Sequence, residues 1–256
     1  MKQKQTARVL SQVEAAPGIF DCWIETSLAA QAKPGQFICI YPKNQSTLLP
    51  RPISICERNE EQTALRIVYR IAGQGTREFS AYRKGDSINI LGTLGNGFPV
   101  EKAEGRKVFL MGGGIGIPPI LQLAKEMQAE KQIIAGYRDD QMFLKEDLER
   151  YGKVFIATED GSAGTKGNVM DAVAACSLQA DMIFACGPMP MLRAIKNYAA
   201  QKGIPAYISL EEHMACGVGA CLGCVVKTKE ADRHSHVHNA RICTDGPVFE
   251  AGEVDI

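Results

Sequence analysis

Residues 211–224 read EEHMACGVGACLGC, and one more cysteine follows at position 243. Together the four cysteines make the pattern C-x4-C-x2-C-x18-C, formed by Cys216, Cys221, Cys224 and Cys243. This is the plant-type spacing for a [2Fe–2S] cluster, in which three thiolates come from one tight loop and the fourth from elsewhere. The glycines within the loop suit this task, because glycine reaches backbone angles that other residues adopt only at a cost. The pattern therefore predicts one [2Fe–2S] cluster bound by these four thiolates.

Other uses of the cysteines fit less well. Zinc sites favour paired C-x2-C motifs, and only Cys221 and Cys224 form one. Disulfide frameworks are typical of small secreted domains, and a Rieske centre needs histidines in place of two cysteines. Zinc is the main alternative. Because an iron–sulphur cluster moves single electrons, the rest of the chain is expected to supply them.

The bulk properties predict a globular, cytoplasmic protein. A chain of 256 residues holds one large domain or two to three small ones, and zero net charge argues against nucleic acid or an anionic membrane as partner. No apolar run follows the N-terminus, and glycines and prolines interrupt the apolar stretch 108–124, so neither a signal peptide nor a membrane span is predicted. Nine cysteines without an export signal fit a reducing compartment. Buried positions are expected for Cys22, Cys39, Cys56 and Cys176.

Residues 1–100 are predicted to form an antiparallel β-barrel. Short β-rich stretches recur there at near-regular spacing, with turn signals such as KPG at 33–35 and KGD at 84–86 between them. The expected strands are 20–26, 36–41, 52–56, 64–70 and 87–91, and one short helix is expected over 76–82.

Two motifs in this barrel point to phosphate. In RPIS at 51–54, a rigid proline holds Arg51, whose guanidinium could bind a phosphate, while the Ser54 hydroxyl could bond a ring nitrogen. In GQGT at 73–76, glycines open a helix whose free N–H groups could bind an anion. Each motif alone could be an ordinary strand start or a capped turn. Together they favour a cofactor that carries a diphosphate.

From residue 105 onwards, strands and helices alternate. This alternation is typical of a doubly wound parallel sheet with helices on both faces. The expected strands are 108–111, 132–137, 154–159, 181–185 and 206–210, and the expected helices run to about 129 and over 142–151, 168–176 and 189–202.

Two loops of this sheet are candidates for binding a nucleotide, because ligands bind such sheets beyond the carboxyl ends of the strands. GGGIGIPP at 112–119 follows the first strand, but Pro119 stands where a complete dinucleotide fingerprint has its third glycine. CGP at 186–188 ends a later strand at the same edge, although a core cysteine and a plain turn would also explain it.

Acidic pairs at 139–140 and 159–160 end neighbouring strands and could hold a ribose hydroxyl, or they could be solvated loop ends. Arg138 beside them could equally bind a 2′-phosphate, so the sequence leaves NAD and NADP open. Three alternating histidines, His234, His236 and His238, could bind a metal ion, but a solvated polar hairpin is favoured and no role is assigned to them.

The order of these parts resembles the ferredoxin–NADP reductase-like family, on the motifs RPIS, GQGT, GGGIGIPP and CGPMPML. The tail, EEHMACGVGACLGC with a later ICTDGPVF, is similar to the electron-transfer subunits of dihydroorotate dehydrogenase B. The resemblance covers essentially the whole chain. It implies an FAD-binding barrel over 1–100, an NAD-binding α/β domain over 101–210 and a small [2Fe–2S] segment over 211–256.

The resemblance also implies site residues. FAD contacts fall on Arg51, Pro52, Ile53, Ser54, Val68, Tyr69, Arg70, Gly75 and Thr76. The nicotinamide is expected to face Gly112, Gly114, Gly116, Cys186, Gly187 and Pro188, and the cluster ligands are the four cysteines named above. GTLGNGFP, ending at Pro99, is expected at the domain junction.

The implied function is electron transfer from NADH through FAD and the cluster to the FMN of a catalytic subunit that makes orotate for pyrimidine synthesis. A heterotetramer with two copies of each subunit is expected, and dihydroorotate chemistry is expected on the partner. The flavin/iron–sulphur subunit of another NAD(P)H-dependent oxidoreductase, of ferredoxin or sulfide dehydrogenase type, is the alternative. A redox sensor or scaffold that uses the cluster only for stability is a third.

Overall fold

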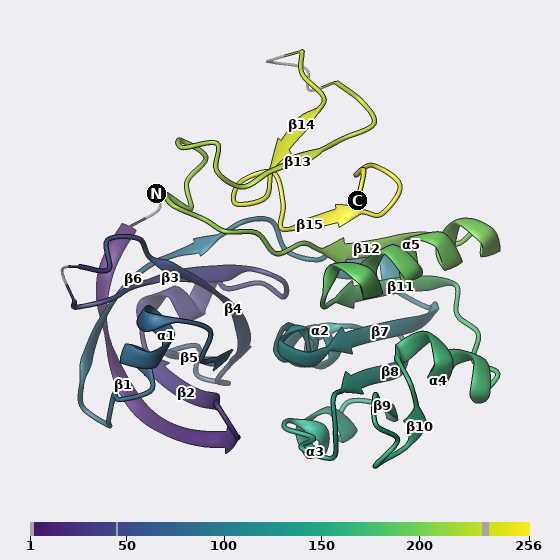
Figure 1. Ribbon diagram of the computed structural model, residues 1–256, viewed down its shortest axis with the longest axis horizontal. Coiled ribbons are helices and arrows are strands. Elements are labelled where there is room, and N and C mark those ends of the chain that lie inside the picture. The colour runs from purple at the N-terminus through teal and green to yellow at the C-terminus, as the bar shows by residue number, and fades with distance from the viewer. Residues whose placement is uncertain (1–2, 45, 232–235) are drawn as a thin grey trace.

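The computed structural model describes residues 3–44, 46–231 and 236–256, and its N-terminal third is a closed barrel (Figure 1). The strand order around the barrel is β1-β2-β5-β4-β3-β6, with antiparallel pairing throughout. The antiparallel barrel predicted from the strand spacing is confirmed. Its elements are β1 (Gln3–Ala16), β2 (Ile19–Glu25), a 3-10 helix (Ser27–Gln31), β3 (Phe37–Tyr41), β4 (Arg51–Arg58), β5 (Ala64–Arg70), α1 (Gln74–Phe79) and β6 (Ser87–Leu94).

The longest strand of the barrel, β1, was not expected. It pairs with β2 along one edge and with β6 along the other, and so closes the barrel. Only Ala7, Val9 and Ala16 of this strand are buried apolar residues, and its many polar side chains obscure the alternation by which strands are recognised. The helix expected over 76–82 begins two residues earlier, at Gln74.

Strand β3 faces two cores. Ile38 and Ile40 lie in the barrel interior, whereas Phe37 and Cys39 point outward into a core shared with the C-terminal segment. This follows from the period of two along a strand, which sends successive side chains to opposite faces. The C-terminal segment therefore packs against the outer face of the barrel at β3.

The second sheet has seven strands in the order β10-β9-β8-β7-β11-β12-β15. Core contacts place α2 and α3 on one face and α4 and α5 on the other, so the doubly wound arrangement is confirmed (Figure 1). Its strands are β7 (Lys107–Gly113), β8 (Glu130–Tyr137), β9 (Lys153–Thr158), β10 (Thr165–Lys166), β11 (Met182–Cys186), β12 (Ala206–Ser209) and β15 (Val248–Glu250). Its helices are two 3-10 turns (Val100–Ala103, Gly114–Gly116) and α2 (Pro118–Glu126), α3 (Lys145–Glu149), α4 (Val169–Ala175) and α5 (Met189–Lys202).

The C-terminal segment contributes to both larger parts. Its strands β13 (Val225–Lys227) and β14 (Asn239–Arg241) form a hairpin, and β15 pairs antiparallel with β12 at the edge of the seven-stranded sheet. The segment was expected to be too small for a core of its own. Its buried residues instead complete a core with the barrel and the sheet, as Met214, Cys224, Ile242, Cys243 and Phe249 show.

The junction stretch at 92–99 is bonded to the C-terminal segment. The Asn96 amide N–H donates to the Gly246 carbonyl at 2.6 Å, and the Asn96 side chain donates to the Asp245 carbonyl at 2.9 Å. Among the described residues, no helix is long and apolar enough to span a membrane.

Candidate redox site

The two phosphate motifs of the barrel meet in space. A Cβ built on Gly75, in the first turn of α1, would lie 2.8 Å from Nε of Arg51, the first residue of β4. Arg51 also donates from Nη1 to the Leu49 carbonyl at 2.6 Å. Because position 75 has no side chain, the guanidinium can lie directly over the helix start. A guanidinium and a helix N-terminus side by side suit a diphosphate, so these residues fit the expected FAD.

Thr76 shapes this turn. Its hydroxyl accepts the N–H groups of Ala72 at 2.9 Å and Gly73 at 3.2 Å, and the residue is 7% exposed. The first bond within the helix runs from the Arg77 N–H to the Gly73 carbonyl, which leaves the N–H groups of Gln74 and Gly75 at the open end. Thr76 therefore positions the loop, and the N–H groups of Gln74 and Gly75 are the candidates for binding a diphosphate.

The VYR triplet that ends β5 has two buried side chains and one exposed side chain. Val68 is buried in the core shared with the sheet, and Tyr69 lies in the barrel interior, where its hydroxyl donates to Gln12 Oε1 at 2.9 Å. Of the three, only Arg70 has an exposed side chain. The side chains of Val68 and Tyr69 thus pack in these two cores, and contact of the triplet with FAD stays a prediction.

The two candidate nucleotide loops pack against each other. A Cβ on Gly116 would lie 2.4 Å from the carbonyl oxygen of Cys186, and a Cβ on Gly187 would lie 3.2 Å from the Gly113 nitrogen. Strands β7 and β11 are parallel neighbours with Gly112 opposite Cys186, so both loops leave the same carboxyl edge. The structure therefore brings together GGGIG and CGP at the edge where parallel sheets bind ligands.

The glycines at this edge differ in role. Gly112 lies within the sheet, and a Cβ there would meet Ile117 Cα at 2.9 Å, so this glycine serves strand–helix packing. Gly114 has a φ of +52° and nothing within 4 Å of a Cβ position, so it faces open space. Pro188 caps the start of α5. Of these positions, Gly114 is the one most open to a ligand.

Cys186 is held as a thiol. Burial raises its pKa to about 12, opposed by a hydrogen bond with Ser209 and reinforced by the charge of Glu211. At neutral pH the sulphur therefore keeps its proton and presents an uncharged surface. Glu211 was not predicted to be part of this site. In the sequence, a carboxylate directly after a strand cannot be distinguished from a solvated loop end, and only the fold places it beside Cys186.

The acidic residues proposed as ribose partners partly serve their own turns. Asp139 accepts the Gln141 N–H at 3.0 Å, and Asp160 accepts both the N–H and the hydroxyl of Ser162. Asp140 and Glu159 lie at the same edge. Among the described residues, neither of these carboxylates accepts a backbone N–H of its own turn. They are the better candidates for a ribose.

The cluster loop is built around Cys216. Its sulphur accepts N–H groups from Val218 at 3.4 Å, Ala220 at 3.3 Å and Cys221 at 3.4 Å. Burial opposes ionisation of Cys216, but these N–H groups outweigh it and lower the pKa to about 6. A loop that aims several N–H groups at one sulphur is prepared to hold a thiolate, which is the form that ligates a metal.

The four cysteine thiols interact with one another. Cys216 interacts with Cys221, and Cys243 interacts with Cys224 and with Cys216. Across the described ranges, no three His, Cys, Asp or Glu side chains converge on a single ion position. The C-x4-C-x2-C-x18-C spacing of the four cysteines is what favours a two-iron cluster over a tetrahedral zinc ion.

Strand β3 connects the flavin motif to this loop. Cys39 on β3 is fully buried and stands opposite Pro52 of β4 in the strand register. On its other side, a Cβ built on Gly217 would lie 2.9 Å from Cys39 Sγ, and Gly217 has a φ of +68°. A single strand therefore separates the flavin motif from the cluster loop.

The contacts of Arg241 and Asp245 beside Cys243, here called the Arg241–Asp245 clamp, were also not predicted from the sequence. Arg241 donates from Nε to Asp245 Oδ2 at 3.1 Å, and the same carboxylate oxygen accepts the Arg241 N–H at 2.8 Å. Arg241 Nη1 reaches the Gly219 carbonyl at 3.5 Å. The arginine thus ties the turn that carries the fourth cysteine to the loop that carries the first three.

Two other predictions have mixed outcomes. Cys22, Cys39 and Cys56 are buried as expected, but Cys176 is exposed, because it caps the solvent end of α4. Of the three histidines, His234 lies outside the described residues, and His238 Nδ1 lies 3.0 Å from the Lys229 carbonyl.

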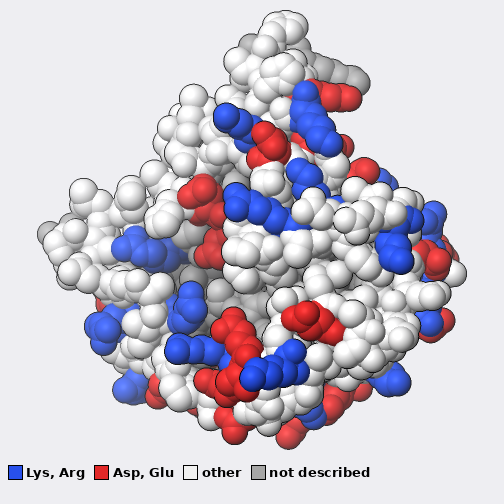
Figure 2. Space-filling model, turned by 45° about the vertical axis from the view of Figure 1, so that its right-hand side comes forward, with Lys and Arg blue, Asp and Glu red and all other residues white. Residues whose placement is uncertain are grey.

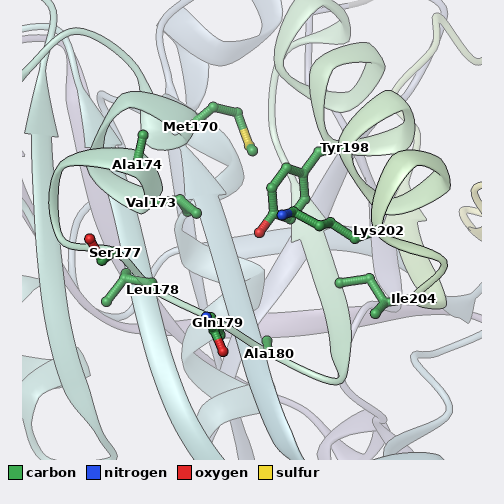
Figure 3. Close-up of a pocket in the computed structure, with 10 residues that line it drawn as sticks. All are labelled: Met170, Val173, Ala174, Ser177, Leu178, Gln179, Ala180, Tyr198, Lys202 and Ile204. Carbon is green, nitrogen blue, oxygen red and sulfur yellow. The ribbon is translucent and has the colours of Figure 1, made fainter.

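A hollow of about 630 Å³ between α4 and α5 is not part of this site (Figure 3). It is lined by Met170, Tyr198, Lys202 and the loop 177–180, which leads into β11. It therefore lies where strands of the sheet begin, opposite the edge with the glycine loops. Figure 2 shows a face that is hollowed at its centre, with basic and acidic side chains interspersed around the hollow.

Comparison with known proteins gives the same picture. Residues 211–255 match the iron-sulfur cluster binding domain of dihydroorotate dehydrogenase B, and residues 110–197 match an oxidoreductase NAD-binding domain. The chain is 41% identical to the "Dihydroorotate dehydrogenase B (NAD(+)), electron transfer subunit" of Bacillus cereus, over 99% of each chain. The chain belongs to this family of electron transfer subunits. The resemblance seen in the sequence is confirmed.

Solved structures agree on the fold. An NADH-dependent reduced ferredoxin-NADP oxidoreductase, described in a study of flavin-based electron bifurcation, has a TM-score of 0.86 and 29% identity and covers 97% of this chain and 89% of its own. A ferredoxin NADP+ reductase from Neisseria gonorrhoeae with bound FAD and NADP has a TM-score of 0.67, 15% identity and coverage of 78% and 92%. The reductase-like fold, the iron–sulphur segment and the oxidoreductase assignment are confirmed. FAD, a [2Fe–2S] cluster and NAD are its cofactors.

Proposed function

We propose that this subunit takes electrons from NADH at the edge of the seven-stranded sheet and delivers them, through FAD on the barrel and the [2Fe–2S] cluster, to the FMN of a catalytic dihydroorotate dehydrogenase subunit. The observation that carries the proposal is the adjacency of the flavin motif and the cluster loop, with only β3 between them. When bound, FAD accepts the two electrons of a hydride and releases them one at a time, which the cluster requires.

The chain's own residues have defined tasks in this scheme. Arg51 and the backbone at Gly75 hold the diphosphate, with Pro52, Ile53 and Ser54 continuing the contact along β4. Gly114 leaves space for the nicotinamide, and the protonated Cys186 gives it an uncharged surface. The four cysteines hold the cluster as thiolates. No residue of this chain is assigned to dihydroorotate oxidation, which belongs to the partner.

The flavin site is tested by Arg51→Ala. Charged hydrogen bonds contribute about 1.5–3 kcal/mol each, so FAD affinity should fall roughly 10- to 150-fold. Flavin fluorescence titration of the apoprotein measures the effect, and chromatography of extracted flavin identifies the cofactor. Arg8→Ala is the matched control, since Arg8 pairs with Glu25 at an exposed site of the same barrel. Extracted FMN, or equal FAD affinity in both variants, would refute the assignment of this site.

The cluster face is proposed to dock the catalytic subunit. Val218 and Leu222 of the cluster loop are exposed large apolar residues, 42% and 64% accessible, whereas their neighbour Met214 is buried. Exposed apolar side chains beside a redox centre suit a surface that a partner covers. A heterotetramer with two copies of each subunit and a cytoplasmic location are part of this proposal; the location is supported by nine cysteines, all of them described by the structure and none in a disulfide.

Leu222→Asp is therefore expected to separate two activities. Reduction of an artificial dye by NADH should stay near the wild-type rate, because that reaction needs no partner. Orotate formation in the reconstituted complex should fall at least tenfold, about the effect of losing 1.4 kcal/mol of binding. Leu48→Asp, at an exposed leucine of the loop before β4, is the matched control. A parallel loss of both activities would show that Leu222 shields the cluster within the subunit instead.

A second candidate function is favoured by the 29% identity to the NADH-dependent reduced ferredoxin-NADP oxidoreductase. In that case the cluster would pass electrons to a partner other than a dihydroorotate dehydrogenase. Purification of the native complex discriminates, since FMN in the partner and FAD in this chain fit the first proposal. A sensor or scaffold role predicts a chain that NADH does not reduce at all.

A further inference from the structure

Among the residues that the structure describes, three ion pairs join the barrel to the seven-stranded sheet domain, and together they are called the interdomain ion network. All six side chains are at most 25% exposed, so the pairs are largely removed from solvent. The pairs, with their N–O distances, are Arg66–Asp147 at 3.0 Å, Lys125–Glu57 at 2.8 Å and Arg58–Glu126 at 2.9 Å.

Arg66 on β5 is the centre of the network. Within the barrel its guanidinium binds Asp21 at 2.7 Å and Glu57 at 3.3 Å, which fixes its position. Its remaining bond reaches across to Asp147 on α3. A backbone hydrogen bond also links the two domains, since the Arg58 N–H donates to Oε1 of the buried Gln122 on α2 at 2.7 Å.

The network lies away from the cofactor sites. Glu57 and Arg58 are the last two residues of β4, whereas the flavin motif occupies its first four. At about 3.3 Å per residue, Glu57 lies roughly 10 Å along the strand from Ser54 and roughly 20 Å from Arg51. None of the network side chains belongs to the flavin motif or to the two nucleotide loops, so we expect the network to act on the redox site through the position of one domain relative to the other.

We infer that the interdomain ion network sets the angle between the two domains and so holds the nicotinamide edge against the flavin in the geometry that hydride transfer needs. Domains within one chain move relative to each other unless their interface prevents it. A displacement of 1 Å at the reacting atoms can cost about 100-fold in rate. The network residues are thus positioning residues, and the inference rests on the proposed transfer of a hydride from NADH to FAD.

The test is the double variant Asp147→Asn with Lys125→Gln, in the full chain loaded with FAD and cluster. Both changes lie in the sheet domain and leave Arg66 paired with Asp21 and Glu57, so no barrel charge loses all its partners. The rate of flavin reduction at saturating NADH, normalised to bound FAD, should fall at least about tenfold with little change in the apparent KM. The long-wavelength absorbance of the nicotinamide–flavin complex should fall with it.

Exchanging the two charges of the Arg58–Glu126 pair provides a rescue experiment. Arg58→Glu alone should slow flavin reduction, and addition of Glu126→Arg should restore most of the rate, because the pair is rebuilt with opposite polarity. Arg8→Gln with Glu25→Gln removes an exposed ion pair inside the barrel and should change nothing.

A double variant that matches the wild type in rate and absorbance would overturn the inference, as would an exchange that fails to restore the Arg58→Glu variant. A wild-type chain with FAD bound that NADH does not reduce would instead contradict the proposed function itself.

Discussion

Replacement of Cys243 by serine is expected to remove the cluster while leaving FAD in place. Cys243 is buried, and Arg241 and Asp245 hold its turn against the loop that carries the other three cysteines. A serine hydroxyl at this position is a harder and less readily ionised ligand than a thiolate. The wild type should contain about two irons and two acid-labile sulphides per chain, and the variant should lose most of both.

Iron and sulphide assays on anaerobically purified protein measure this loss. Cys176→Ser is the matched control, because Cys176 is exposed and lies on the far helix α4. FAD content should stay near one per chain in both variants, since the flavin motif lies on β4. Full iron in the Cys243→Ser protein, or zinc without labile sulphide in the wild type, would contradict the ligand assignment.

Gly116→Val is expected to abolish most NADH-dependent reduction. A Cβ at this position would lie 2.4 Å from the Cys186 carbonyl oxygen and 2.6 Å from the Gly187 nitrogen, and both are backbone atoms that cannot rotate away. The two nucleotide loops would have to separate, which displaces the nicotinamide edge. A misplacement of this kind can cost about 100-fold in rate.

Stopped-flow reduction by NADH measures this effect, with reduction by dithionite as the check that flavin and cluster remain functional. Gly252→Ala is the control, because nothing lies within 4 Å of a Cβ built there. Equal rates of NADH-dependent reduction in Gly116→Val and Gly252→Ala would show that this edge does not bind the nucleotide.

The sequence predicted the architecture wherever a local signal was strong. Cysteine spacing, two phosphate motifs and strand–helix alternation are local patterns, and the helix at Met189–Lys202 and the strand at Ala64–Arg70 have the predicted bounds. Strand β1 was missed because its polar residues carry little burial signal. The pairing of β15 with β12 joins residues about 40 positions apart and depends on tertiary contact alone.

The same limit applies to the site. Single motifs were enough to propose Arg51, Gly75, Gly116 and the four cysteines, because each type of residue has its own chemistry, and these assignments stay predictions. The burial of Tyr69, the placement of Glu211 beside Cys186 and the Arg241–Asp245 clamp all arise from contacts between distant or ambiguous positions. No periodicity or spacing encodes them.

The central claim is that electrons from NADH reach the cluster of this chain through its own flavin. Low-temperature EPR of the FAD- and cluster-loaded chain, after anaerobic addition of NADH and without any partner, tests it most directly. A signal from the reduced [2Fe–2S] cluster should appear in the wild type and should be absent in Cys243→Ser. The control variant Cys176→Ser should show the same signal as the wild type. A wild-type chain whose flavin is bleached by NADH while no cluster signal appears would contradict the account.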